Sequence, residues 1–182
     1  MVVALDGPAA SGKSTVARRV AAALDLLYVD SGALYRGVTL HVLREGVNTD
    51  DEDAVVEALG RAAFRFVVRE GAVRFQLNGE DPGEALRSER VNRNVSPVAR
   101  VPEVRHRVTG WLRDMKRHGG LVMEGRDIGS VVFPDASWKF YLDASPEERA
   151  RRRHAETTEQ GISQDAVVES IRRRDRIDSK RQ

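Results

Sequence analysis

Short apolar runs alternate along the chain with stretches in which apolar residues recur at helical spacing. Residues 2–6 are apolar up to Asp6 and are closed by Gly7-Pro8, a pattern typical of a buried parallel strand. From Ser14 the apolar positions predict an amphipathic helix, and residues 26–29 form a second short strand before Asp30. Strands that alternate with helices predict an α/β fold, with a mainly parallel sheet and helices on both faces.

The rest of the chain continues this alternation. Further strands are predicted at residues 121–123 and 138–142. Further helices are predicted around residues 34–42 and over residues 50–64, 104–118 and 165–174. Another helix begins at Ser145, because an N-cap serine is followed there by Pro146 and two acidic residues.

Residues 64–77 have a different pattern, the two-residue alternation of half-buried strands. Apolar and polar residues alternate from Phe64 to Val68 and again from Val73 to Leu77, on either side of Glu70-Gly71. Two such runs around a turn predict a β-hairpin. Since the surrounding chain is α/β, we expect residues 64–90 to form a small inserted sheet.

The bulk composition is ordinary for a water-soluble domain. The 182 residues suit one compact domain, and 41% of them are hydrophobic, which is enough for a core. No apolar run approaches the roughly 20 residues of a membrane-spanning helix, and the first residues lack the basic start of a signal peptide. Cysteine is absent, which rules out disulfides and thiolate metal sites. We therefore expect a cytoplasmic protein, and a monomer because no exposed apolar stripe is evident.

Arginine carries most of the positive charge. Of the 30 Lys and Arg residues only four are lysine, namely Lys13, Lys116, Lys139 and Lys180. Arginine grips phosphate oxygens with a planar fork of donors, which suits an enzyme that handles phosphates. A general preference for arginine is the alternative at most of these positions. The net charge is only +2, so composition alone decides nothing about nucleic acid.

The segment from Gly7 to Ser14 matches the Walker A pattern of a P-loop at every fixed position. Glycines let the backbone curl so that successive N–H groups point at one concave spot and hold phosphate oxygens. The helix that follows adds the positive end of its dipole. Lys13 is expected to reach the β- and γ-phosphates, and the Ser14 hydroxyl to bind Mg²⁺. The strand before the motif and the helix after it are both predicted, which makes this signal strong.

A P-loop alone does not identify the phosphoryl acceptor. The chain has no Asn-Lys-x-Asp motif for reading guanine, and no Asp-Glu pair ends an apolar strand as in an ATP-hydrolysing motor. Its length leaves little room for nucleic-acid modules. These absences favour a kinase of a small acceptor, without a nucleic-acid partner or a membrane.

Candidate acceptor residues follow the second and third core strands, whose carboxyl ends line the ligand crevice of a doubly wound sheet. Asp30 is placed to lie near the Mg²⁺, or simply to cap the next helix, and Arg36 to reach an acceptor phosphate. Arg126 and Asp127 offer a cation for a phosphate and an anion for a base or sugar, or else a local ion pair. Among the arginines at residues 149–153, most are expected to be solvated, while one or two stabilise the transferring phosphate.

Together these motifs resemble the bacterial cytidylate kinase family. The resemblance is carried by residues 5–15, residues 30–36, residues 125–136 and residues 142–150, and it covers essentially the whole chain in order. It implies a P-loop core at residues 1–35, 106–145 and 166–182. It further implies a monophosphate-binding insert with a small β-sheet at about residues 36–105, and a helical lid at about residues 146–165.

The resemblance also implies roles for individual residues in transfer of a phosphoryl group from MgATP to CMP or dCMP, within pyrimidine nucleotide metabolism. The residues implied to bind ATP are Gly7, Pro8, Ala9, Ala10, Ser11, Gly12, Lys13, Ser14 and Thr15. Those implied to bind CMP are Ser31, Arg36, Ser96, Arg105, Arg126, Asp127, Arg174, Asp178 and Arg181. The catalytic set is Lys13, Arg126, Arg149 and Arg153, and the Mg²⁺ set is Ser14 and Asp30. A kinase of UMP, dCMP or a polyol acid is the near alternative, and an RNA-binding regulatory P-loop protein the distant one.

Overall fold

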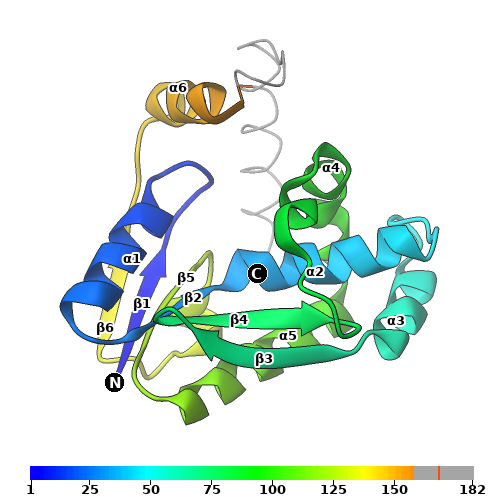
Figure 1. Cartoon of the computed structure of the whole chain (residues 1–182). Coiled ribbons are helices and arrows are strands. Elements are labelled where there is room, and N and C mark those ends of the chain that lie inside the picture. The colour runs from blue at the N-terminus through cyan, green and yellow to red at the C-terminus, as the bar shows by residue number, and fades with distance from the viewer. Residues whose placement is uncertain (158–167, 169–182) are drawn as a thin grey trace.

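The alternation of strands and helices predicted from the sequence is present in the structure (Figure 1). The computed structural model describes residues 1–157 and residue 168. Its strands are β1 (Val2–Asp6), β2 (Leu27–Asp30), β3 (Phe64–Arg69), β4 (Ala72–Leu77), β5 (Leu121–Gly125) and β6 (Trp138–Tyr141). Its α-helices are α1 (Lys13–Ala23), α2 (Ser31–Arg44), α3 (Glu52–Arg61), α4 (Glu89–Val98), α5 (Pro102–Asp114) and α6 (Pro146–Thr157). Its shorter helices are the 3₁₀ helices η1 (Gly83–Arg87) and η2 (Met115–His118) and the π-helix η3 (Ile128–Val132).

Some predictions fall outside the described residues. The helix predicted over residues 165–174 lies outside the described residues, apart from residue 168. The predicted CMP-binding residues Arg174, Asp178 and Arg181 also lie outside them. The helix predicted over residues 50–64 is shorter in the structure, because Ala62 adopts an extended backbone and Phe64 already belongs to β3.

The strands form one sheet in the order β3-β4-β2-β5-β1-β6. Among the strands of the described residues, the pairs β1–β5, β1–β6, β2–β5 and β2–β4 are parallel, and the pair β3–β4 is antiparallel. The predicted mainly parallel sheet is therefore confirmed. The register pairs Asp6 with Gly125 and Asp30 with Glu124, so polar residues from three strands meet at one edge of the sheet.

Helices cover both faces of this sheet, as predicted. Successive residues of a strand point to opposite faces. Val3, Leu5 and Val122 pack with Ala17 and Ala21 of α1 on one face. On the other face, buried residues of β1 and β5 pack with apolar residues of α2, α3, α4 and α5 in the larger core. This arrangement holds the carboxyl ends of β1, β2 and β5 beside the start of α1.

The predicted β-hairpin is present, but its strands end at Leu77, whereas the inserted sheet was expected to extend to residue 90. β3 and β4 pair over their full length, and β4 joins the core sheet through the parallel pair Tyr28–Ala72. The residues after the hairpin are helical, in η1 and α4. Ser88 caps α4 by accepting a hydrogen bond from the Val91 N–H. The hairpin therefore extends the core sheet instead of standing apart from it.

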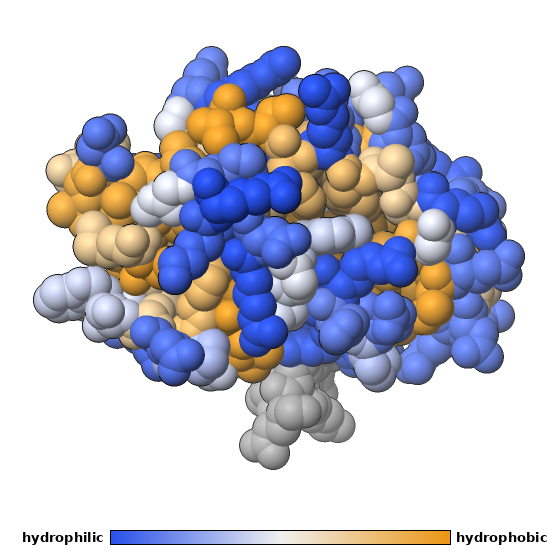
Figure 2. All heavy atoms as spheres, turned by 90° about the horizontal axis from the view of Figure 1, so that it is seen from below, coloured by the Kyte–Doolittle hydropathy of each residue, from blue (hydrophilic) through white to orange (hydrophobic). Residues whose placement is uncertain are grey.

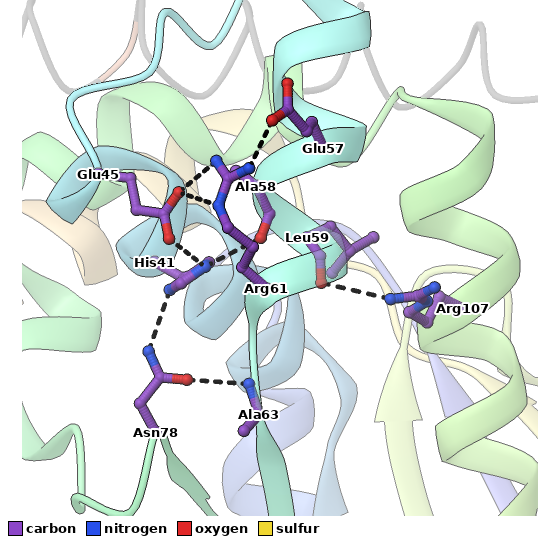
Figure 3. Close-up of polar contacts among 9 residues, drawn as sticks. All are labelled: His41, Glu45, Glu57, Ala58, Leu59, Arg61, Ala63, Asn78 and Arg107. Atoms are coloured by element: carbon purple, nitrogen blue, oxygen red, sulfur yellow. Dashed lines mark hydrogen bonds and ion pairs between the residues drawn. The ribbon is translucent and has the colours of Figure 1, made fainter.

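A buried histidine joins α2, α3 and the loop after β4 (Figure 3). His41 Nε2 lies 3.0 Å from the Ala58 carbonyl oxygen and 3.1 Å from a carboxylate oxygen of Glu45. Its Nδ1 lies 3.3 Å from the amide nitrogen of Asn78, whose oxygen accepts a hydrogen bond from the Ala63 N–H. Arg61 donates to Glu45 in turn. These contacts fix the helices of this half of the molecule to the hairpin.

The surface mixes apolar and charged side chains, as the view from below shows (Figure 2). The edge strand β6 is an exception to the expectation that no exposed apolar stripe is present. Trp138, Phe140 and Tyr141 are each more than half exposed along this strand. Within residues 1–157, none of the helices has the length and apolar character that a membrane crossing requires.

Gly37 of α2 gives a test of core packing. A methyl group there would lie 2.7 Å from Cζ of the buried Phe75 ring and 3.0 Å from Cε1 of Phe64. We expect Gly37→Ala to lower the free energy of unfolding by about 1–2 kcal/mol, because overpacking outweighs the better helix propensity of alanine. Urea denaturation measures this change. Gly110→Ala in α5, where the added methyl has nothing within 4 Å, is the matched control and should be neutral or stabilising. Equal destabilisation in both variants would contradict the packing argument.

Candidate active site

The loop between β1 and α1 has the curled backbone that the P-loop motif predicts. Ala10 and Gly12 both adopt positive φ angles, 59° and 90°. The Ser11 N–H donates to the Pro8 carbonyl at 3.4 Å, and the Thr15 N–H donates to the Gly12 carbonyl at 3.1 Å. A side chain at Gly7 would lie 2.1 Å from the Leu142 carbonyl oxygen, so only glycine fits there. The start of the loop is therefore packed tightly against the backbone of Leu142, the residue that follows β6.

Lys13 begins α1 and folds back over the loop. Its Nζ donates a hydrogen bond to the Pro8 carbonyl at 3.1 Å. Burial lowers the pKa of Lys13 to about 8, and the positive charge of Arg126 adds to this, while the carboxylates of Glu124 and Asp30 oppose it. The side chain therefore lies among charged groups from β2, β5 and the segment after β5, as expected of a residue that serves both donor and acceptor.

A buried carboxylate lies opposite the P-loop serine. Glu124 at the end of β5 is only 2% exposed, and burial followed by the charge of Asp30 raises its pKa. The Ser14 hydroxyl donates to Glu124 Oε2 at 2.8 Å, and the Tyr28 hydroxyl donates to Oε1. No role was assigned to Glu124 or Tyr28 from the sequence. The signal that the sequence offered was an acidic residue at the end of an apolar core strand.

The oxygen atoms gathered here fit a magnesium ion. Ser14, Asp30 and Glu124 offer a hydroxyl and two carboxylates, the hard ligands that Mg²⁺ prefers. Across the described residues no group of three or more His, Cys, Asp or Glu side chains is placed to hold a metal. Mg²⁺ usually binds through one or two protein ligands together with substrate phosphates and water.

Asp30 also caps a helix, so both roles considered for it from the sequence remain compatible. Its Oδ1 accepts a hydrogen bond from the Ala33 N–H at 3.1 Å at the start of α2. Its Oδ2 lies 3.9 Å from Nη1 of Arg36, a residue of α2 six positions further along the chain. The cap directs the carboxylate toward the crevice and keeps Arg36 beside it.

The segment after β5 is anchored by Asp6 of β1. Asp6 Oδ1 and Oδ2 accept hydrogen bonds from the Ile128 and Gly129 N–H groups, each at 2.8 Å. Burial raises the pKa of Asp6, these two hydrogen bonds lower it, and the nearby charge of Asp127 raises it further. The loop that carries the candidate acceptor residues is therefore tied to the strand that leads into the P-loop.

Asp127 forms an ion pair with Arg105 of α5, whose Nη2 lies 2.5 Å from Asp127 Oδ2. Both side chains are about one quarter exposed, so the pair is accessible to solvent. This ion pair joins two segments that are distant in the sequence, α5 and the segment after β5. Ser31 donates from its hydroxyl to the Glu124 carbonyl at 2.7 Å, and Ser96 is a buried residue of α4. The hydrogen bond of Ser31 is thus made to the backbone of β5 and not to the Arg105–Asp127 pair.

The helix α6 lies above the loop between β1 and α1 (Figure 1), and two of its arginines donate hydrogen bonds to carbonyls of that loop. Arg149 is only 5% exposed, and it donates to the Ala144 carbonyl at 3.1 Å and to the Ala9 carbonyl at 3.4 Å. Arg152, to which no role was assigned from the sequence, donates to the Ser11 carbonyl at 3.0 Å and to Glu148 at 2.7 Å. Arg153 lies on the same helix, and its side chain is outside the described part of the structure.

Comparison with known proteins identifies the family. The family model described as cytidylate kinase matches residues 3–182. The cytidylate kinase of Pelotomaculum thermopropionicum is 48% identical over 182 residues, which cover 98% of this chain and 80% of that protein. The cytidylate kinase of Chlorobaculum tepidum is 46% identical and covers 100% of this chain and 79% of its own length. These matches bear out the resemblance described from the motifs, and the chain therefore belongs to the cytidylate kinase family.

Proposed function

We propose that this chain transfers the γ-phosphoryl group of MgATP to CMP and dCMP, giving the diphosphate and ADP. The observation that carries the proposal is the meeting of two sites at one edge of the sheet. The P-loop follows β1, and Asp127, the ion-pair partner of Arg105, lies in the segment after β5, the strand next to β1. Ligands bind outside the carboxyl ends of strands in open α/β sheets. Family membership supports the choice of acceptor.

The donor ATP is held by residues 7–15, whose curled backbone surrounds Lys13. Ser14 and Asp30 would hold the Mg²⁺, and Glu124 accepts a hydrogen bond from the Ser14 hydroxyl at 2.8 Å. A Mg²⁺ ion bound there offsets negative charge on the β- and γ-phosphates. Lys13 and the α6 residues Arg149 and Arg153 supply the remaining positive charge around the transferring group.

The acceptor is selected by groups on both sides of the crevice. Arg36 and Arg126 bind the CMP phosphate, and Ser31 lies beside them at the start of α2. Asp127 accepts a hydrogen bond from the cytosine amino group, the same pairing by which carboxylates read cytosine in nucleic acids. Arg105 and Ser96 address the O2 and N3 side of the base. Arg174, Asp178 and Arg181, outside the described residues, are assigned to CMP from the family resemblance.

Positioning and charge neutralisation supply the catalysis. The acceptor phosphate is already an anion, so in-line attack requires no strong general base. The lid predicted at residues 146–165 closes over the reacting groups and excludes water. We further propose that the protein acts as a cytoplasmic monomer without a nucleic-acid partner.

The lowered pKa of Lys13 predicts a pH dependence of nucleotide binding. The protonated ammonium attracts phosphates below pH 8, and the neutral amine formed above that pH does not. We therefore expect the Kd for ADP, measured by calorimetry in the presence of a chelator, to rise about tenfold between about pH 7 and about pH 9. Lys13→Met should bind more weakly and show little change over this range. An equally steep rise in Lys13→Met would contradict the assignment of this pH dependence to Lys13.

An ADP-release assay across nucleoside monophosphates tests the proposed reaction. CMP and dCMP should stimulate ADP release most strongly, while UMP, AMP and GMP should be poor acceptors. Lys13→Ala should lower turnover by about a hundredfold or more without changing the thermal unfolding temperature. Preference for a different acceptor would overturn the assignment to CMP. Tight, salt-dependent RNA binding without acceptor-stimulated ADP release would instead favour a regulatory P-loop protein.

Asp127→Asn tests the selection of the base. Uracil presents a carbonyl where cytosine has its amino group, so the Asp127 carboxylate repels it. The asparagine amide can donate to that carbonyl, and we expect the ratio of kcat/KM for CMP over UMP to fall about tenfold or more. Asp135→Asn, a change of the same chemistry at a carboxylate that has no assigned role, should leave the ratio unchanged. An unchanged ratio in Asp127→Asn would show that Asp127 does not read the base.

A further inference from the structure

Tyr28 contacts the carboxylate that faces the P-loop serine, yet it belongs to neither substrate-binding segment. Tyr28 lies on β2 and Glu124 on β5, with Tyr28 paired to Val122 and Asp30 to Glu124. Alternate residues of a strand share one face of the sheet. Tyr28, Asp30 and Glu124 therefore share the face that α1 covers, where Ser14 begins its first turn.

The position of the Tyr28 ring is fixed from α1. The guanidinium carbon of Arg18 lies 5.1 Å from the centre of the ring, a distance typical of a cation–π contact. Arg18 follows Ser14 by four residues, so the two side chains lie on the same face of α1. The ring also packs beside the apolar cluster that joins α1 to the sheet. One face of α1 thus contacts both ends of the Tyr28–Glu124–Ser14 chain.

Each carboxylate oxygen of Glu124 accepts a hydrogen bond from a different hydroxyl group. Ser14 donates to Oε2, so the serine proton points at the carboxylate and the lone pairs of its hydroxyl remain available to a cation. Tyr28 donates to Oε1 and thereby fixes the rotation of the carboxyl group. Without that donor, Oε1 would be a buried acceptor lacking its partner, and the carboxylate would reorient to find another. The direction of the Ser14 hydroxyl therefore depends on the Tyr28 hydroxyl.

We propose that Tyr28 is a positioning residue for the divalent cation, acting through Glu124 on the Ser14 hydroxyl. The inference rests on the proposed function, since it requires the cation of MgATP to bind at Ser14. Groups that orient metal ligands in this way typically change metal affinity by about 10- to 100-fold when they are removed.

The test is Mn²⁺ binding to the intact protein with ADP bound, followed by the electron paramagnetic resonance signal of free Mn²⁺. Tyr28→Phe removes only the hydroxyl, and we expect the Kd for Mn²⁺ to rise about tenfold. The Kd for ADP in the presence of a chelator should stay within about twofold, because Tyr28 is not assigned to the nucleotide. Tyr141→Phe makes the same chemical change at a side chain that is 69% exposed, and it should leave both constants unchanged.

A double-mutant cycle with Ser14→Ala separates positioning from a structural role. When Ser14 is absent, Tyr28→Phe should have little further effect on Mn²⁺ binding, because the two residues act on one hydroxyl. An equal effect in both backgrounds would overturn the proposal, as would unchanged Mn²⁺ binding in Tyr28→Phe or an equal loss of ADP affinity in the chelator. Failure of the wild-type protein to bind Mn²⁺ with ADP would instead contradict the proposed metal site itself.

Discussion

Two buried carboxylates at the ends of β1 and β5 determine how the active-site edge is built. Asp6 is 9% exposed and Glu124 is 2% exposed. A buried carboxylate is costly unless hydrogen-bond donors surround it. The donors come from distant parts of the chain: two backbone N–H groups of the segment after β5 for Asp6, and the hydroxyls of Ser14 and Tyr28 for Glu124. Satisfying these two acids therefore joins the P-loop, β2 and the acceptor segment into one unit.

Close packing of the backbone at two glycines also joins segments of the active-site edge that are distant in the sequence. A side chain at Gly7 would meet the Leu142 carbonyl oxygen at 2.1 Å, and one at Gly125 would meet the Ser31 hydroxyl at 2.6 Å. Both glycines follow or end central strands, where neighbouring segments cross without room for a Cβ atom. The arginines of α6 come from outside this packed edge and contact the loop through the carbonyls of Ala9 and Ser11. The P-loop is thus part of a tightly packed edge of the sheet, whereas Arg149 and Arg152 reach it from the separate helix α6.

The sequence predicted most of the architecture because local patterns determine it. Strand ends, the P-loop turn and the hairpin at Glu70-Gly71 each have a signature within a few residues. The joining of β4 to β2 was missed because it rests on one non-local pair, Tyr28–Ala72. Glu124 was missed for the same reason: its burial and its hydroxyl partners depend on the register of β2 against β5. Arg152 could not be distinguished from its neighbours, since only the rotation of α6 over the loop decides which arginine reaches Ser11.

In the proposed function, the selection of the acceptor depends on the same buried acids as the binding of the donor. Asp127 immediately precedes Ile128, whose N–H is held by Asp6 at 2.8 Å. Arg105 holds the other side of Asp127 at 2.5 Å, so the carboxylate is oriented from α5 before any base arrives. Because the side chain is already ordered, less conformational entropy is lost when the base binds. Asp6 also ends β1, the strand that leads into the P-loop. The position of the proposed base-reading carboxylate of Asp127 is therefore fixed relative to the donor site through Asp6.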